Sequence, residues 1–360
     1  MGKLSGIRVV DLSQFLPGPM LTLMMADQGA EVIKVEPAAG DPARSQGPFA
    51  NGQSIWFANL NRGKRGVVLD LKSAAGTAAL TEMLREADVF VEGFRPGVMA
   101  RLGFGWDQVR QINPRIVYCA ISAFGQSGEL AHHPAHDMAV QAMAGFLSVN
   151  DGVDGRPAVP GVPAADVAAG LTGLSAVLMA LIGRERTGLG DFVDIAMFDS
   201  LLPWCAHTAG SALAGGEAPR SDTQRSLGGA AFYNVYDCAD GRHIVLGGRE
   251  IKFARALLTA LGRPDLVALA EAEAGALQAP LIAFLRETFR TRTRDEWAAF
   301  MADLDVAFAP VLDFAETFAQ PHVVERGLLR TVDGRPHIAP AIRFADDAWA
   351  PGPVPGLGGQ

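Results

Sequence analysis

The chain has 360 residues, of which 49% are hydrophobic and 19% are charged, and its formal net charge is −8. This balance excludes a disordered or fibrous chain and provides enough apolar surface for two domains or one large divided domain. The acidic charge argues against nucleic acid as a main partner, so any polyanionic ligand needs a local basic patch.

The cysteines and the apolar stretches bear on the cellular compartment in which the protein is expected to fold. Cys119, Cys205 and Cys238 are odd in number, lie far apart and form no CxxC pair. We therefore expect neither a disulfide framework nor a structural zinc site, and a reducing cytoplasm fits. The N-terminus shows no apolar signal segment. The longest weakly polar stretch, 167–182, is short for a membrane span and predicts a buried core helix.

The first 122 residues alternate between strand-like and helical patterns. Short β-branched runs predict strands, and helical stretches lie between several of them. Gly29 stands where a helix C-cap glycine belongs. This alternation predicts an α/β fold with a Rossmann-like parallel sheet and helices on both faces. The expected strands are 7–12, 31–36, 66–71, 88–93 and 115–122, and the expected helices are 19–28, 73–87 and 96–102.

The remaining chain predicts the end of a large domain and a smaller α+β domain. We expect helices at 134–149, 166–184 and 198–214, a strand at 191–197, a hairpin at 233–248, helices within 250–302 and a strand at 305–312. The resulting division is a large domain over 1–197 completed by 325–360, a linker over 198–232, a small domain over 233–312 and a return linker over 313–324. The tail after 350 is rich in proline and glycine and predicts little regular structure.

Five runs in fixed order carry a resemblance to a known family. They are RVVDLSQFLPGPMLTLMMADQGAEVIKVE (8–36), NRGKRGVVLDLK (61–72), EGFRPGVMARLGFG (92–105), AHDMAVQAMAG (135–145) and ADVAAGLTGLSAVLMALIGRERTGLG (165–190). The chain resembles the CaiB/BaiF superfamily of class III CoA-transferases and α-methylacyl-CoA racemases over nearly its full length. The resemblance implies an interlocked homodimer, an active site between the large domain of one chain and the small domain of the other, and acyl-CoA substrates. It implies no metal and no cofactor other than the coenzyme A of the substrate. The net charge and the length of the longest apolar stretch predict no nucleic-acid partner and no membrane partner.

Basic residues in two of these runs are candidates for binding the CoA phosphates. Arg62, Lys64 and Arg65 precede a predicted strand, and Arg95 lies in a strand-to-helix turn. Arginine forks and helix N-termini are common phosphate ligands in proteins. The alternative is that these are ordinary solvated surface charges. One position differs from the racemase pattern. Racemases of the superfamily often carry arginine after the second strand, whereas this chain has Pro37, which is closer to the transferase pattern.

The two activities in the superfamily need different chemistry. A racemase needs two proton carriers on opposite sides of a planar enolate and donors for its oxyanion. A transferase needs a carboxylate nucleophile that forms mixed anhydrides and an enzyme–CoA thioester. The resemblance aligns Asp166 with the acid/base of racemases and with the nucleophile of transferases. Its structural alternative is an N-cap at a predicted helix start.

His136 and Glu250 favour the racemase. The resemblance implies histidine at position 136 in racemases and an aromatic residue in transferases. It also places a catalytic glutamate in a glycine-rich strand-to-helix turn, where Glu250 stands ahead of Lys252 and Phe253. The structural alternatives are a histidine that bonds nearby backbone and an acidic residue in the first helical turn.

The preferred prediction is epimerisation of 2-methylacyl-CoA thioesters. His136 would act on one face of the enolate and a proton-sharing Asp166–Glu250 pair on the other, with three helix N-termini converging on the thioester carbonyl. The second prediction is a class III CoA transferase, which the run ADVAAG and Pro37 favour. The third is a CoA-binding protein or lyase with neither activity.

Overall fold

The computed structural model of the chain describes residues 2–152, 154–332, 334–345 and 349–359. Its internal contacts form two compact units. The first comprises Met1–Ala144, Pro160–Trp204 and Pro321–Gln360, and the second comprises Gly145–Val159 and Cys205–Gln320. This division assigns 145–159 to the second unit, whereas the sequence placed it in the large domain. It also divides the predicted 198–232 linker after Trp204.

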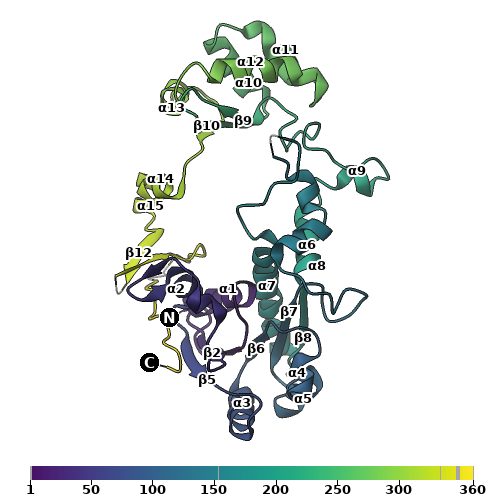
Figure 1. The fold of residues 1–360 in the computed structure, drawn as a ribbon, viewed down its shortest axis with the longest axis vertical. Coiled ribbons are helices and arrows are strands. Elements are labelled where there is room, and N and C mark those ends of the chain that lie inside the picture. Colours follow the sequence, from purple (N-terminus) through teal and green to yellow (C-terminus); the bar gives the residue numbers. More distant parts are fainter. Residues whose placement is uncertain (1, 153, 333, 346–348, 360) are drawn as a thin grey trace. The chain divides into compact units, whose positions relative to one another are not determined.

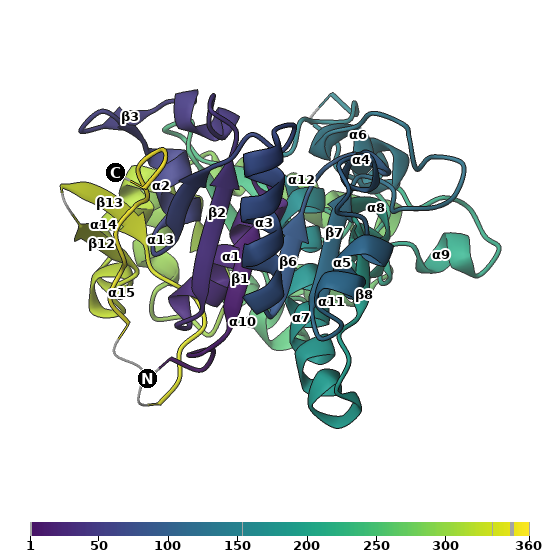
Figure 2. The ribbon, with the colours of Figure 1, turned by 90° about the horizontal axis from the view of Figure 1, so that it is seen from below.

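The first unit is built on a six-stranded sheet in the order β5-β2-β1-β6-β7-β8 (Figure 2). Every neighbouring pair is parallel, which confirms the predicted parallel sheet. The four inner strands are mostly buried and rich in β-branched residues, as expected when helices cover both faces, whereas the two edge strands are only partly buried. They are β1 (Arg8–Asp11), β2 (Glu31–Glu36), β5 (Arg65–Val68), β6 (Val89–Glu92), β7 (Val117–Ser122) and β8 (Phe192–Ala196).

Helices pack on the two faces of this sheet. One face carries α3 (Ala74–Glu86), α4 (Val98–Arg101) and α5 (Trp106–Ile112), and Leu80 and Leu84 of α3 share its core with Phe90 and Tyr118. The other face carries α1 (Pro17–Asp27) and α7 (Ala164–Thr187). Gly173 allows close packing there, because a Cβ on it would lie 2.8 Å from Leu21 Cδ1.

Strand order creates the crevice that matters for function. The central strand β1 lies between β2 and β6. After β1 the chain adds β2 and β5 toward one edge of the sheet, and it then adds β6, β7 and β8 toward the other edge. The loops after β1 and β6 therefore diverge at the carboxyl ends of these strands. In open α/β sheets such a switch in strand order is the usual place for a ligand.

Helix α7 is longer than its predicted span of 166–184, and it ends at Gly188 with φ 72°. Its inner residues are buried against α1, β7 and β8, as predicted for a core helix, whereas Met179 and Ile182 are exposed. By length and hydropathy alone, α7 is the one helix in the described part of the chain that could cross a membrane.

The second unit contains the predicted hairpin and the later strand in a three-stranded antiparallel sheet. Its strands are β9 (Tyr233–Asp237), β10 (His243–Gly247) and β11 (Phe308–Pro310). The buried Tyr236, Phe289 and Trp297 form its aromatic core with residues from the helices. Those helices are α10 (Ile251–Ala260), α11 (Val267–Glu271), α12 (Ala279–Phe289) and α13 (Arg294–Met301).

Two predicted helices are interrupted. The span 134–149 contains α6 (Asp137–Met143) and a 3₁₀ turn, Phe146–Val149, because Gly145 between them takes a left-handed φ of 78°. The span 198–214 contains α8 (Met197–Leu201), the 3₁₀ turn Leu202–Cys205 and α9 (Gly210–Leu213). The described tail after Trp349 has no helix or strand, as predicted.

Helix α4 lies within the predicted helix 96–102, whereas α5 and several other short elements were not predicted from the sequence (Figure 1). The others are β3 (Phe49–Ala50), β4 (Gln53–Ser54), α2 (Ile55–Asn61), α14 (Phe314–Ala319), α15 (Pro321–Glu325), β12 (Leu329–Val332) and β13 (Arg335–Ile338). Of these, α2 contributes Trp56 to the surroundings of the site described next.

Candidate active site

A cavity of about 600 Å³ opens in the first unit where the sheet order switches. Its walls come from the ends of β1, β6 and β7, from the loop before α6 and from the first turns of α6 and α7. Its lining residues include Phe15, Arg95, His133, His136 and Asp166. Two of the three predicted catalytic residues therefore line one cavity.

His136 directly precedes α6 as its N-cap residue, and its side chain makes no capping hydrogen bond. The predicted position at a helix start is confirmed, and the imidazole is exposed. His133 also lines the cavity, which the sequence did not indicate, and its ring lies 5.8 Å from that of Phe124.

Asp166 lies in the first turn of α7 and is not its N-cap. The helix begins at Ala164, and its N-cap residue is Pro163, which has no side-chain acceptor. The N-cap role considered for Asp166 is therefore wrong. Its carboxyl therefore does not cap its own helix, and Asp166 forms part of the cavity wall.

Asp137 supplies the missing cap from another helix. Its Oδ1 accepts the backbone N–H of Ala165 at 2.8 Å and that of Asp166 at 3.1 Å. Its Oδ2 accepts a short hydrogen bond from Gln141. Because Asp137 follows His136 directly, one carboxylate ties α6 to the start of α7 and joins the two candidate residues. The sequence signal was the His-Asp pair itself, whose aspartate had no assigned role.

The pKa of Asp166 is raised from 3.8 to about 7, first because the carboxyl is buried and second because Asp137 lies near it. A carboxyl with a pKa near neutrality can both donate and accept a proton at physiological pH. The predicted source of this effect was Glu250, whereas in the structure the neighbouring negative charge belongs to Asp137.

Arg95 lines the same cavity from the loop that follows β6, and its side chain is exposed. A hydrogen bond at the start of this loop restrains its backbone, because the N–H of Phe94 donates to the Glu92 carboxylate at 2.7 Å. Glu92 is buried, and burial raises its pKa to about 7. Arg95 is thus an available cation on an anchored loop at the mouth of the cavity.

Two of the three basic residues at 62–65 that are candidates for the CoA phosphates are buried, so the alternative of solvated surface charges is wrong for them. Arg62 is buried and pairs with Asp27 at 2.7 Å, and Lys64 is buried and pairs with Asp11 at 3.1 Å. Lys64 also donates to the carbonyl of Pro19 and to Asn61. Their donors hydrogen-bond to groups inside the first unit. Solvated surface charges would not make these contacts, and neither would side chains whose donors are free to bind phosphate. Arg65 on β5 is exposed.

These buried charges stabilise the loop between β1 and α1. Burial lowers the pKa of Lys64 to about 8 against the opposing pull of Asp11. For Asp11, burial works against ionisation, yet Lys64 and Lys34 outweigh it and bring its pKa to about 2. The pair therefore remains charged at neutral pH, and its charges neutralise each other beneath the cavity floor.

Glu250 belongs to the second unit. It is exposed and is the N-cap residue of α10, as predicted, although its side chain makes no capping bond. The neighbouring Lys252 pairs with Asp305 at 3.1 Å, and its ammonium lies 4.6 Å from the Phe253 ring centroid. The catalytic role of Glu250 stays a prediction.

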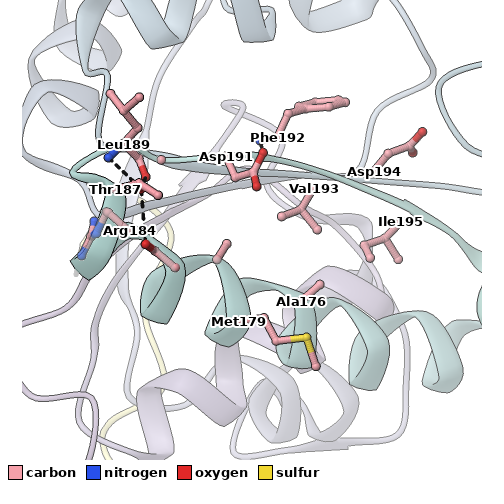
Figure 3. Close-up of a pocket in the computed structure, with 13 residues that line it drawn as sticks. Ala176, Met179, Arg184, Thr187, Leu189, Asp191, Phe192, Val193, Asp194 and Ile195 are labelled. Carbon is pink, nitrogen blue, oxygen red and sulfur yellow. Dashed lines mark hydrogen bonds between the residues drawn. The ribbon is translucent and has the colours of Figure 1, made fainter.

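A second cavity, of about 670 Å³, lies between α7 and the edge strand β8 (Figure 3). Thr187 accepts a hydrogen bond from Leu189 N–H at 3.2 Å there, and Arg184 pairs with Asp88 at 2.9 Å. Most of its remaining wall is aliphatic side chain or strand backbone, and none of the predicted catalytic residues lines it. The cavity with His136 and Asp166 is therefore the candidate active site.

The comparisons with known proteins decide the family. The model of CoA-transferase family III matches residues 4–359. The chain belongs to CoA-transferase family III. It is 36% identical to the acetyl-CoA:oxalate CoA-transferase of Acetobacter aceti over 91% of this chain and 85% of that protein. It is 33% identical to the human alpha-methylacyl-CoA racemase over 94% of this chain and 86% of that protein.

A solved structure supports the same assignment for the fold. The crystal structure of a CaiB/BaiF family protein from Brucella suis has a TM-score of 0.86 and 31% identity, and the match covers 99% of this chain and 97% of that one. The predicted family and α/β fold class are confirmed. The protein is an enzyme of a family that acts on acyl-CoA, and relatives of both reaction types lie at similar identity.

Proposed function

We propose that this family III protein epimerises 2-methylacyl-CoA thioesters by 1,1-proton transfer. The observation that carries the proposal is a pair of proton carriers, His136 and Asp166, on the wall of one cavity. The pKa of Asp166 near 7, caused by burial and by Asp137, suits a group that exchanges protons and is higher than a nucleophilic carboxylate needs.

The proposed reaction moves one proton off and another on. The neutral imidazole of His136 takes the hydrogen from the carbon next to the thioester carbonyl, and the C–H electron pair enters the enolate. Protonated Asp166 then returns a proton to the opposite face of that carbon. In the reverse direction the two residues exchange roles. None of these proton transfers requires a metal or a redox cofactor.

Binding of the CoA part is proposed for Arg95 and Arg65. Both are exposed cations, and Arg95 also lines the cavity. Guanidinium groups bind phosphate through paired hydrogen bonds. Arg62 and Lys64 are left out of this proposal because their donors are used by Asp27 and Asp11.

We further propose that the protein works as a homodimer and that Glu250 contributes to proton transfer. Glu250 carries an exposed carboxyl without a capping bond, so it is available for such a role. Sedimentation at micromolar concentration tests the dimer, and Glu250→Gln tests the carboxyl. Full exchange activity in that variant would remove Glu250 from the mechanism.

The second candidate function is CoA transfer between carboxylic acids. The observation in its favour is the similarity to named CoA-transferases, which include the acetyl-CoA:oxalate enzyme. In that reaction ionised Asp166 attacks the thioester carbonyl and forms a mixed anhydride, and the CoA thiolate leaves. The thiolate attacks the Asp166 carbonyl, which releases the donor carboxylate and forms an enzyme–CoA thioester. The acceptor carboxylate then attacks that thioester to form a second anhydride, and the released thiolate takes the acceptor acyl group from it, which regenerates ionised Asp166. His136 would have no direct part in these steps.

Incubation of a 2-methylacyl-CoA in heavy water separates the two functions. Deuterium at the α-carbon and loss of optical purity without an acceptor acid are the expected results. Transfer of CoA to added oxalate or succinate, with hydroxylamine trapping of Asp166 and no deuterium uptake, would refute the epimerase. Binding of CoA with neither reaction would refute both activities.

A further inference from the structure

The loop between β1 and α1 contains an unusual backbone conformation at the cavity wall. Phe15 has φ 61°, in the left-handed region that L residues with a Cβ rarely adopt. Within the described ranges, the other non-glycine residue with positive φ is Asn51, a residue type that tolerates this region. A bulky aromatic residue at such a position is costly, so its side chain needs a reason to be there.

Buried charges hold this conformation in place. Lys34 donates from Nζ to the carbonyl of Ser13 at 3.0 Å and pairs with Asp41 at 2.9 Å. Asp41 in turn accepts the backbone N–H of Phe15 through a long hydrogen bond of 3.4 Å. Both charged side chains are fully buried. The backbone of segment 13–15 is therefore held by the buried side chains of Lys34 and Asp41.

The ring of Phe15 contacts the proposed base. Its centroid lies 6.3 Å from that of His136, and the two planes meet at 84°, which is the edge-to-face arrangement that aromatic rings prefer. On its other side the ring lies 6.2 Å from Trp56 of α2. Phe15 and His136 both line the cavity.

We propose that Phe15 is a positioning residue for His136: the left-handed backbone at position 15 presents the ring, and the ring holds the imidazole in one orientation. The inference rests on the proposed function, because it assigns a purpose to the orientation of the base. His136 is exposed and makes no capping hydrogen bond, so few other contacts restrict its ring. Glycine or asparagine would take the backbone conformation at lower cost but would leave the imidazole unsupported.

The test compares Phe15→Gly, Phe15→Asn, Phe15→Leu and Phe15→Tyr in the full-length protein. Phe15→Gly and Phe15→Asn remove the ring and relieve the backbone, Phe15→Leu keeps an apolar side chain, and Phe15→Tyr keeps the ring. Asn51→Gly is the matched control, because it relaxes the other left-handed position outside the cavity. Urea unfolding verifies that each variant is folded.

Two readouts are needed. The first is the linewidth of the His136 ring signal in ¹H–¹³C spectra, assigned by its loss in His136→Gln. The second is the separate measurement of kcat and KM for α-hydrogen exchange. Loss of the ring is expected to narrow the signal, because an exposed side chain that is no longer held reorients within nanoseconds. It is also expected to lower kcat roughly 10- to 100-fold with little change in KM, since misplacement of a reacting group acts on the chemical step. Phe15→Tyr and Asn51→Gly are expected to retain wild-type values.

The outcomes separate this inference from the function on which it rests. A wild-type protein without exchange overturns the epimerase, while the linewidth still reports on Phe15 because it needs no reaction. A His136 signal that stays as broad in the ring-less variants as in the wild type overturns the inference alone. A raised KM with unchanged kcat also overturns it, because that result assigns the ring to ligand binding. A narrowed signal with unchanged kcat overturns it as well, because the orientation would then not limit the reaction.

Discussion

Asp137 Oδ1 lies 3.1 Å from the backbone nitrogen of Asp166 and accepts its N–H, although 29 residues separate the two carboxyl groups in the chain. One contact thus has two effects. It caps α7, whose own N-cap residue Pro163 provides no side-chain acceptor. It also places a negative charge near Asp166, which adds to burial in raising the pKa of Asp166 to about 7.

The first prediction concerns this charge. Asp137→Asn keeps an oxygen that can cap α7 but removes the charge, so the pKa of Asp166 is expected to fall below its present value of about 7. The part of the pH–rate profile that requires protonated Asp166 should move to lower pH. A profile of kcat from pH 5 to 9 checks this. Asp137→Ala, which also removes the cap, should cost an additional ~0.5–2 kcal/mol of stability.

The second prediction concerns stability and pH. Asp166 has a folded-state pKa of about 7 against an ordinary value of 3.8, so the folded protein holds this proton where the unfolded chain has lost it. Its contribution is fully favourable below about pH 4 and is lost as the pH rises through 7. Asp166→Asn should therefore stabilise the protein by ~1–3 kcal/mol at pH 8, after allowance for solvent screening, and by little at pH 4. Urea unfolding at both pH values measures the difference, and equal changes would contradict the pKa assigned to Asp166.

The third prediction concerns the base. His136→Gln should lower α-hydrogen exchange by ~10²–10⁴-fold, the usual contribution of a positioned acid or base. His132→Gln is the matched control, since His132 is an exposed residue of the same loop that does not line the cavity. Exchange is followed by mass spectrometry of the recovered thioester. Equal rates for the two variants would remove His136 from the reaction.

The fourth prediction concerns the buried pair Lys64–Asp11. Lys64→Ala leaves the carboxylate of Asp11 buried without its ammonium partner, which should cost ~3–5 kcal/mol of unfolding free energy. The double change Lys64→Met with Asp11→Asn should recover much of that loss. The comparison is made by urea unfolding. A variant with wild-type stability and weakened CoA binding would restore the phosphate role that the sequence suggested.

The fifth prediction concerns the CoA part of the substrate. Arg95→Ala should raise the Kd for CoA roughly 10- to 100-fold, the loss expected for one charge-assisted contact, with unchanged stability. Arg110→Ala is the control, because Arg110 is an exposed arginine of the same unit that pairs with Asp107 and lies outside the cavity. Titration calorimetry at fixed salt measures both. A similar Kd for wild type and Arg95→Ala would place the phosphates elsewhere.

Sequence patterns predicted the main elements because the inner parallel strands are covered on both faces. Buried β-branched runs such as β2 and β7 are recognisable when both faces of a sheet are apolar. The short elements α2 and β12–β13 were missed, because seven or fewer residues give too little periodicity to distinguish them from loops. The helix over 134–149 was overextended, since Gly145 ends it through a left-handed conformation that periodicity does not reveal.

The family, the parallel α/β sheet and two cavity residues, His136 and Asp166, could be predicted from the amino-acid sequence, because they depend on local pattern and on motifs in fixed order. The availability of each charge could not be predicted, because it depends on the folded chain. Lys64 and Arg62 look like surface cations in the chain, but folding buries them against Asp11 and Asp27. Likewise Asp137 acquires its influence on Asp166 only when α6 meets the start of α7. The physical reason is that burial and charge proximity depend on contacts between residues far apart in the chain, and local sequence does not contain those distances.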